Sequence, residues 1–152
     1  MKSLANSHEA EEILTRLREV APSSARRWGT MTPGEMLCHL ADACDCAFAR
    51  RPASSLENAF RRTVVKFVAL RAPMRWPPGI RTLPEFDPKL AGTKPGLFES
   101  DRDRTARLIR ELADLEVEVA GAKHPIFGRL SVAEWKRWGY LHADHHLRKF
   151  GA

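Results

Sequence analysis

The amino-acid sequence predicts an all-α protein, folded as a single domain over residues 1–152. In five segments, apolar residues recur at the spacing that places them on one face of a helix. Three of these segments begin with a Ser or Thr followed three positions later by Glu, which is the pattern of a helix-capping box. No segment shows the alternation of apolar and polar residues that is typical of a strand.

Two of the predicted helices lie in the first third of the chain. The first runs from about Ser7 to Val20, with acidic residues at its start and arginines near its end, as the helix dipole favours. The second follows the sequence TPGEM, in which Thr32 and Glu35 form a capping box and Pro33 takes the first helical position. This helix is expected to continue to about Arg50.

The third predicted helix begins with a capping box at Ser54 and Glu57 and stops ahead of Pro73. An apolar stripe runs along it, formed by Phe60, Val64, Phe67 and Val68. The stretch from Ala72 to Ser100 then holds six of the ten prolines together with many apolar residues. We therefore expect an ordered crossover that packs on the helices and is able to line the mouth of a pocket.

The last two helices are predicted in the C-terminal third. The fourth begins near Ser100 and carries four apolar residues at helical spacing: Leu108, Leu112, Leu115 and Val119. The fifth begins at Ser131, where Glu134 completes a capping box, and continues to about Phe150.

Composition and charge limit the kind of protein this is. The net charge of +6 would suit a nucleic-acid binder, but the basic residues are dispersed or alternate with acids, and no aromatic residues interleave with them. Three clustered cysteines do not form a disulfide framework, and no apolar run reaches the length of a membrane span or a signal peptide. We expect a cytoplasmic protein with no specific nucleic-acid partner and no membrane partner.

Three of the six histidines fall within the sequence HADHH, near the end of the fifth predicted helix. At about 100° per residue, His142 and His146 lie about 40° apart, on the face that also holds Trp135 and Trp138. A polar tail has no reason to share a face with two tryptophans. Buried imidazoles need partners for their ring nitrogens, and one divalent metal satisfies a pair at i and i+4. His145 could also bind, orient a ligand or support the site from behind.

A third ligand is expected from the second helix, because two histidines alone make a weak site. His39 lies at the edge of that helix's apolar stripe, where it can meet the fifth helix, with Glu35 and Asp42 within about 60° of it. Three histidines would leave one coordination position open, which is typical of a reactive metal site. Glu35, Asp42 and His145 are then the candidates for handling protons.

Other interpretations of these residues stay open at this point. The histidines could be core residues whose nitrogens are satisfied by the protein. His124 precedes Pro125, which predicts that it lies in an extended loop. A place in the wall of the pocket is the less favoured alternative. Cys46 lies on the face of His39 and could approach the pocket. Protease chemistry is disfavoured, because Ala143 stands where an HExxH motif has its general-base Glu.

The sequences WGTMTPGEMLCHLAD and HPIFGRLSVAEWKRWGYLHADHHLRKFG resemble the DinB/YfiT-like superfamily of metal-dependent proteins, in particular a subfamily of unknown function with this C-terminal motif. The resemblance covers both ends of the chain and the order of its helices. It implies a four-helix bundle of up-down-down-up topology, with an extra helix and the Pro-rich crossover between the second and third core helices. It also implies a divalent metal, typically nickel or zinc, held by His39, His142 and His146. Related proteins include transferases that use small thiols and metal-dependent hydrolases, and many form homodimers.

Residues and resemblance together predict a metal-dependent enzyme that acts on a small molecule. Its open metal position would activate water or a low-molecular-weight thiol, as in a thiol S-transferase or a hydrolase. The alternatives are a non-catalytic metal- or ligand-binding bundle of a stress response, and a nucleic-acid binder, which rests on the charge alone.

Overall fold

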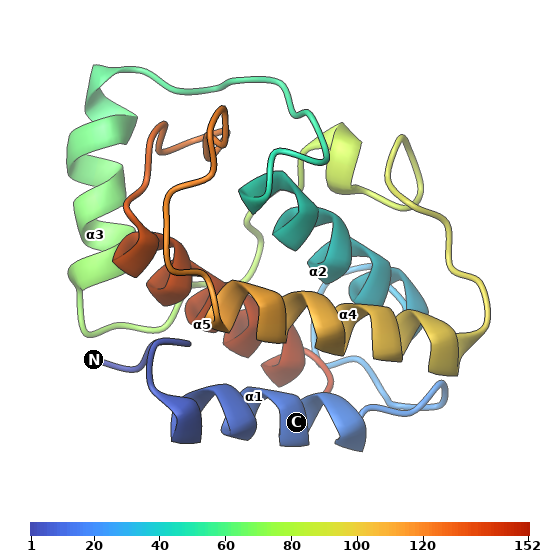
Figure 1. The fold of residues 1–152 in the computed structure, drawn as a ribbon. Helices are drawn as coiled ribbons and strands as arrows, with labels where there is room; N and C mark the ends of the chain where they lie inside the picture. The colour runs from blue at the N-terminus through green and yellow to red at the C-terminus, as the bar shows by residue number, and fades with distance from the viewer.

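Five α-helices and no strands make up the structure, a computed structural model that describes residues 1–152, so the all-α prediction is confirmed. The helices are α1 (Ser7–Glu19), α2 (Pro33–Ala47), α3 (Lys66–Arg71), α4 (Phe98–Ala113) and α5 (Val132–Arg148) (Figure 1). A π-helical turn, Arg61–Val65, leads into α3, and a short 3-10 helix, Pro84–Phe86, lies in the connection to α4. None of the helices has the length and apolar character that a membrane span requires.

The four longer helices pack around one hydrophobic core. α4 packs against α1 and α2, and α5 contacts α1, α2 and α4 (Figure 1). Leu17, Leu112 and Leu147 are completely buried between these helices. Gly139 lets α5 approach closely, because a Cβ atom there would lie 2.7 Å from the side chain of Leu112 and 2.8 Å from that of Leu4.

Capping boxes start α2 and α5, as the sequence predicts. The Glu35 N–H donates to the Thr32 hydroxyl over 3.2 Å, and the Thr32 N–H donates to the Glu35 carboxylate over 2.7 Å. Ser131 and Glu134 make the same reciprocal pair over 3.3 Å and 2.9 Å. Each pair satisfies two backbone N–H groups that a helix start would otherwise leave without a partner.

Two helices end earlier than predicted. α2 ends at Ala47, because Ala49 has a φ of 54°, in the left-handed region that an α-helix cannot continue through. α4 ends at Ala113, so the prediction that Leu115 and Val119 continue it is wrong. Leu115 is buried all the same, since a residue just beyond a helix can reach the core from the following loop.

The capping box predicted at Ser54 and Glu57 does not form, and that prediction is wrong. The Ser54 N–H donates instead to the Glu85 carboxylate over 2.8 Å, which ties this segment to the Pro-rich crossover. Helical turns begin at residue 59, where the Asn58 side chain accepts from the Arg61 N–H over 2.9 Å. A tertiary partner has therefore taken the group that local capping would have used.

The extra helix and the crossover lie between α2 and α4 in the chain, as predicted. α3 stands at the edge of the molecule and contacts α5 (Figure 1). The crossover is ordered on the helices, because Phe86 is buried and the Trp76 indole N–H donates to the Ala69 carbonyl over 2.9 Å. The apolar stripe of the third helical segment is not buried, however: Phe60 is 62% exposed and Phe67 is 67% exposed.

Candidate metal centre

Three histidines from α2 and α5 meet, as the helical angles predicted. The Nε2 atoms of His39 and His142 are 3.0 Å apart, and one ring nitrogen from each of His39, His142 and His146 lies within 4.8 Å of the others. Two nitrogens that each lie about 2.1 Å from one ion are about 3.0 Å apart at a right angle and about 3.4 Å apart at a tetrahedral angle. This trihistidine cluster can therefore hold a divalent metal ion.

Burial keeps the three imidazoles neutral. Desolvation lowers the pKa of His39 to about 4, and it lowers the pKa values of His142 and His146 well below 6.5. The neighbouring imidazoles lower the pKa values of His142 and His146 further, because each disfavours a second positive charge nearby. A neutral imidazole offers a lone pair to a metal, whereas an imidazolium does not.

Hydrogen bonding around the cluster also fits a metal. The Nδ1–H of His39 donates to the Phe86 carbonyl over 2.9 Å, which leaves the lone pair of Nε2 for the cluster. Nδ1 of His146 is buried with no hydrogen-bond partner. Because no protein group holds the His146 ring by this nitrogen, the ring can turn a lone pair toward an ion bound between the three imidazoles.

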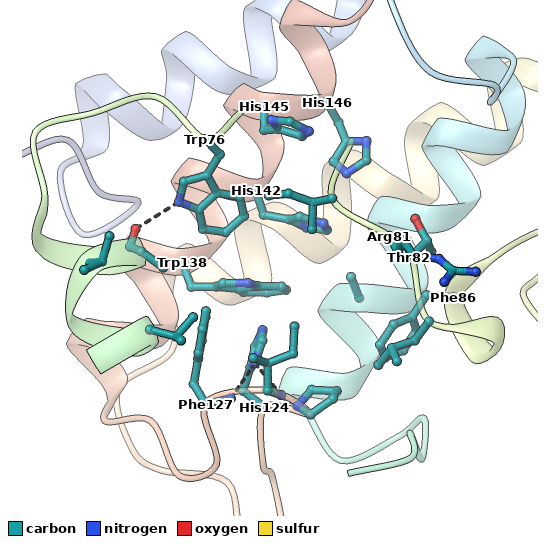
Figure 2. Close-up of a pocket in the computed structure, with 18 of the residues that line it drawn as sticks. Trp76, Arg81, Thr82, Phe86, His124, Phe127, Trp138, His142, His145 and His146 are labelled. Atoms are coloured by element: carbon teal, nitrogen blue, oxygen red, sulfur yellow. Dashed lines mark hydrogen bonds between the residues drawn. The ribbon is translucent and has the colours of Figure 1, made fainter. Parts of the chain in front are cut away.

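A cavity of about 620 Å³ lies beside the trihistidine cluster (Figure 2). Its walls come from α2, the segment 60–69, the crossover, the loop 124–127 and α5. Of its 26 lining residues, 16 are hydrophobic, and the only permanently charged ones are Arg75 and Arg81, both exposed to solvent. The cavity is large and apolar enough to accommodate a small organic molecule.

His145, a predicted candidate for proton handling, lines this cavity. Its ring centroid lies 5.2 Å from that of His146 and 6.3 Å from that of Trp76. Burial lowers the pKa of His145, and its Nδ1 is buried without a hydrogen-bond partner. A neutral imidazole in this state can accept a proton from a group bound in the cavity.

Asp42 and Glu35, the other two candidates for proton handling, do not line the cavity. Asp42 is completely buried and accepts from the N–H and the hydroxyl of Thr93 over 2.8 Å and 2.7 Å, with the Arg51 guanidinium 3.2 Å away. The Glu35 carboxylate caps the start of α2. Helical angles predict that both side chains lie near His39. They carry no information about which groups of other segments bind to the two carboxylates.

Two residues outside the predicted set of ligands and proton carriers, His124 and Cys46, also line the cavity. His124 closes its own loop, as predicted, and also borders the cavity. Cys46 borders it as well, but burial raises the pKa of its thiol to about 11. A thiol with so high a pKa is protonated at neutral pH and does not act as a nucleophile. The crossover lines the cavity, as expected, with Trp76 and Phe86. No sequence signal pointed to Arg75 or Arg81.

Fold and site together define an all-helical protein with a trihistidine cluster beside an apolar cavity. The chain belongs to the family described as "Protein of unknown function (DUF1569)", whose model matches residues 2–152. Comparisons with curated proteins and with solved structures found no match.

Proposed function

We propose that this chain is a divalent-metal-dependent enzyme in which His39, His142 and His146 hold the metal and the adjacent cavity receives a small-molecule substrate. The observation that carries the proposal is the position of three neutral imidazoles at the wall of an apolar cavity. Structural metal sites are closed by protein ligands, whereas a site that faces a cavity keeps a position for a reacting group.

The reaction class that we propose is hydrolysis or thiol S-transfer. A zinc or nickel ion bound here would lower the pKa of a water molecule or a small thiol and so provide a nucleophile at neutral pH. The Phe86 carbonyl orients His39, the aromatic walls keep bulk water from the substrate, and His145 accepts the proton that the nucleophile loses. Asp42 and Glu35 have structural partners and take no part in this scheme.

The proposal extends to the architecture. The insertion of α3 and the crossover between α2 and α4 supports a DinB-like four-helix bundle of up-down-down-up topology. A homodimer is part of the same proposal and rests on the resemblance to that superfamily. A cytoplasmic location is proposed as well, because three free cysteines suit a reducing compartment.

Metal analysis tests the first half of the proposal. Purified protein should contain close to one nickel or zinc ion per chain, and His39→Ala and His142→Ala should each weaken binding roughly a hundredfold or more, because each removes a ligand. His8→Ala is the matched control, since His8 is exposed on α1. Protein without a divalent metal, together with metal titrations that the two variants leave unchanged, would overturn the proposal.

Turnover separates the enzyme from a non-catalytic metal-binding bundle. Metal-loaded protein is expected to turn over either a panel of hydrolysable esters or a panel of thiol adducts, and His145→Gln should slow the reaction while metal content stays the same. Stoichiometric metal uptake without turnover of either panel would favour the non-catalytic alternative.

A further inference from the structure

His124 lies across the cavity from the metal cluster and is not one of its ligands. Figure 2 shows Trp138 between His124 on one side and His142 on the other. The Trp138 ring is stacked on His142 with centroids 4.8 Å apart and meets His124 edge-on with centroids 5.3 Å apart. The Trp138 ring therefore lies between His124 and the cluster, and a group bound at His124 would be within one side chain of the cluster.

The loop 124–127 fixes the tautomer of His124. Its Nδ1 accepts from the backbone N–H groups of Ile126 and Phe127, each over 3.2 Å, so this nitrogen carries no proton. Burial lowers the pKa of His124 to about 3, so the ring is neutral at physiological pH. The single ring proton must therefore be on Nε2.

The Nε2–H of His124 has no acceptor within the protein. Phe127 stacks on the ring with centroids 4.3 Å apart, and the edge that carries Nε2 faces the cavity (Figure 2). The Trp76 indole N–H, by contrast, is already used by the Ala69 carbonyl. A rigid donor that opens to the cavity and has no acceptor in the protein can be satisfied by a ligand bound there.

The surroundings define the chemistry of that ligand. Of the charged side chains, Arg75 and Arg81 line the cavity but are exposed to solvent. The Lys66 ammonium acts on His124, but it does not line the cavity and is already paired with the Glu134 carboxylate over 2.8 Å. A carboxylate buried here would lack a counter-charge, whereas a neutral carbonyl oxygen needs only the donor. The apolar walls suit an aromatic or aliphatic body of the size that about 620 Å³ admits.

We propose that His124 is a positioning residue whose Nε2–H donates to a neutral carbonyl-type acceptor on an otherwise apolar substrate. The hydrogen bond holds the substrate in the cavity with its reacting end toward the trihistidine cluster, and this orienting role rests on the proposed function above. The loop bonds and the ligand bond use different nitrogens of the same ring, so two substitutions can separate them.

The test compares two probes of similar shape, acetophenone and ethylbenzene, of which only acetophenone has an acceptor. Binding to chelated, metal-free protein is followed by tryptophan fluorescence, because Trp76, Trp135 and Trp138 line the cavity. His124→Asn keeps an acceptor for the loop N–H groups and removes the cavity donor, whereas His124→Gln keeps a donor near the position of Nε2. The ratio of the two affinities should shift roughly tenfold toward ethylbenzene in His124→Asn and stay near the wild-type value in His124→Gln.

An unchanged affinity ratio in His124→Asn would overturn the proposal and leave His124 with a loop role alone. A ratio that shifts equally in both variants would overturn it too, because loss of loop geometry would then explain the effect. The probes are measured without metal, so a failure of the chain to bind nickel or zinc would refute the proposed enzyme and leave the donor role of His124 standing.

Discussion

Two halves of the molecule use apolar residues in different ways. In the bundle half, formed by α1, α4 and the sides of α2 and α5 that face them, leucines such as Leu17 and Leu112 are completely buried. The cavity half is formed by residues 59–97, the loop 124–127 and the opposite sides of α2 and α5. Leu70 is completely buried there, but most of its apolar residues border the cavity or face solvent, and Phe67 is 67% exposed.

The difference separates stability from function. Every buried histidine, and the unpartnered Nδ1 atoms of His145 and His146, belong to the cavity half. Neutral imidazoles and unpaired polar atoms lower stability, so the close packing of the bundle half has to offset that cost. The three predictions that follow test this division, beginning with the largest expected effect.

Acidification should destabilise the protein through the buried histidines of the cavity half. In the folded, metal-free chain the pKa of His39 is about 4 and the pKa of His124 is about 3, whereas an unfolded histidine has a pKa of about 6.5. As the pH falls from about 7 to about 5, the unfolded chain takes up protons that the folded chain does not. The free energy of unfolding should then fall by about 2 kcal/mol for each of these two histidines. Urea unfolding of chelated protein across this range measures the loss.

Two variants check that the buried histidines cause this pH dependence. His124→Asn removes one titrating group and should reduce the total loss by about 2 kcal/mol. His8→Asn changes only an exposed histidine and should leave the pH dependence as it is. An unfolding midpoint that stays constant between about pH 7 and about pH 5 would contradict the neutral, buried state of the cavity histidines.

Core truncation should separate the halves by their packing. Leu112→Ala removes a completely buried side chain and should lower the free energy of unfolding by about 3 kcal/mol, through lost apolar contact and the cavity left behind. Phe67→Ala removes a larger side chain and should cost no more than about 0.5 kcal/mol, because that side chain is mostly in solvent. Urea unfolding measures both. A concentration-dependent loss in Phe67→Ala would show instead that a second copy of the chain covers this residue.

Asp42→Asn should give the smallest of the three effects and decide the role of this carboxylate. The amide keeps one acceptor for Thr93 but cannot pair with Arg51, so we expect a loss of about 2 kcal/mol and faster proteolysis of residues 87–93. Thr93→Val is the control and should lose about 1 kcal/mol, because it removes only the hydroxyl bond. Metal titration should not change, since Asp42 does not line the cavity. A shifted pH–rate profile with unchanged stability would restore Asp42 as a proton carrier.

The parts of the fold that the sequence predicts well depend on neighbouring residues. The spacing of apolar residues and the Thr32 and Ser131 capping boxes located α2 and α5, since a helix and its caps involve residues at most about four apart. The i, i+4 spacing placed His142 and His146 on one face for the same reason. Helical angles also placed His39 on the side of α2 that meets them.

The third helical segment shows that local sequence patterns do not determine which partner a residue has in the folded protein. Ser54 and Glu57 have the spacing of a capping box, but Glu85 of the crossover binds Ser54 instead. Its apolar stripe has the period of a buried face, but no further helix covers Phe60 or Phe67. Periodicity indicates that a face can be buried, and only the arrangement of the other elements decides whether it is.

The sequence by itself therefore determined the helices that carry the site and the faces on which the histidines lie. Tertiary structure decided what each polar side chain does, because the partners come from distant segments. The Phe86 carbonyl that orients His39 lies 47 residues away, and the Thr93 groups that occupy Asp42 lie 51 residues away. Periodicity carries no information about contacts at such separations. A histidine on an inward helix face can thus be predicted from the chain, but whether it becomes a ligand, a loop acceptor or a free donor depends on the packed fold.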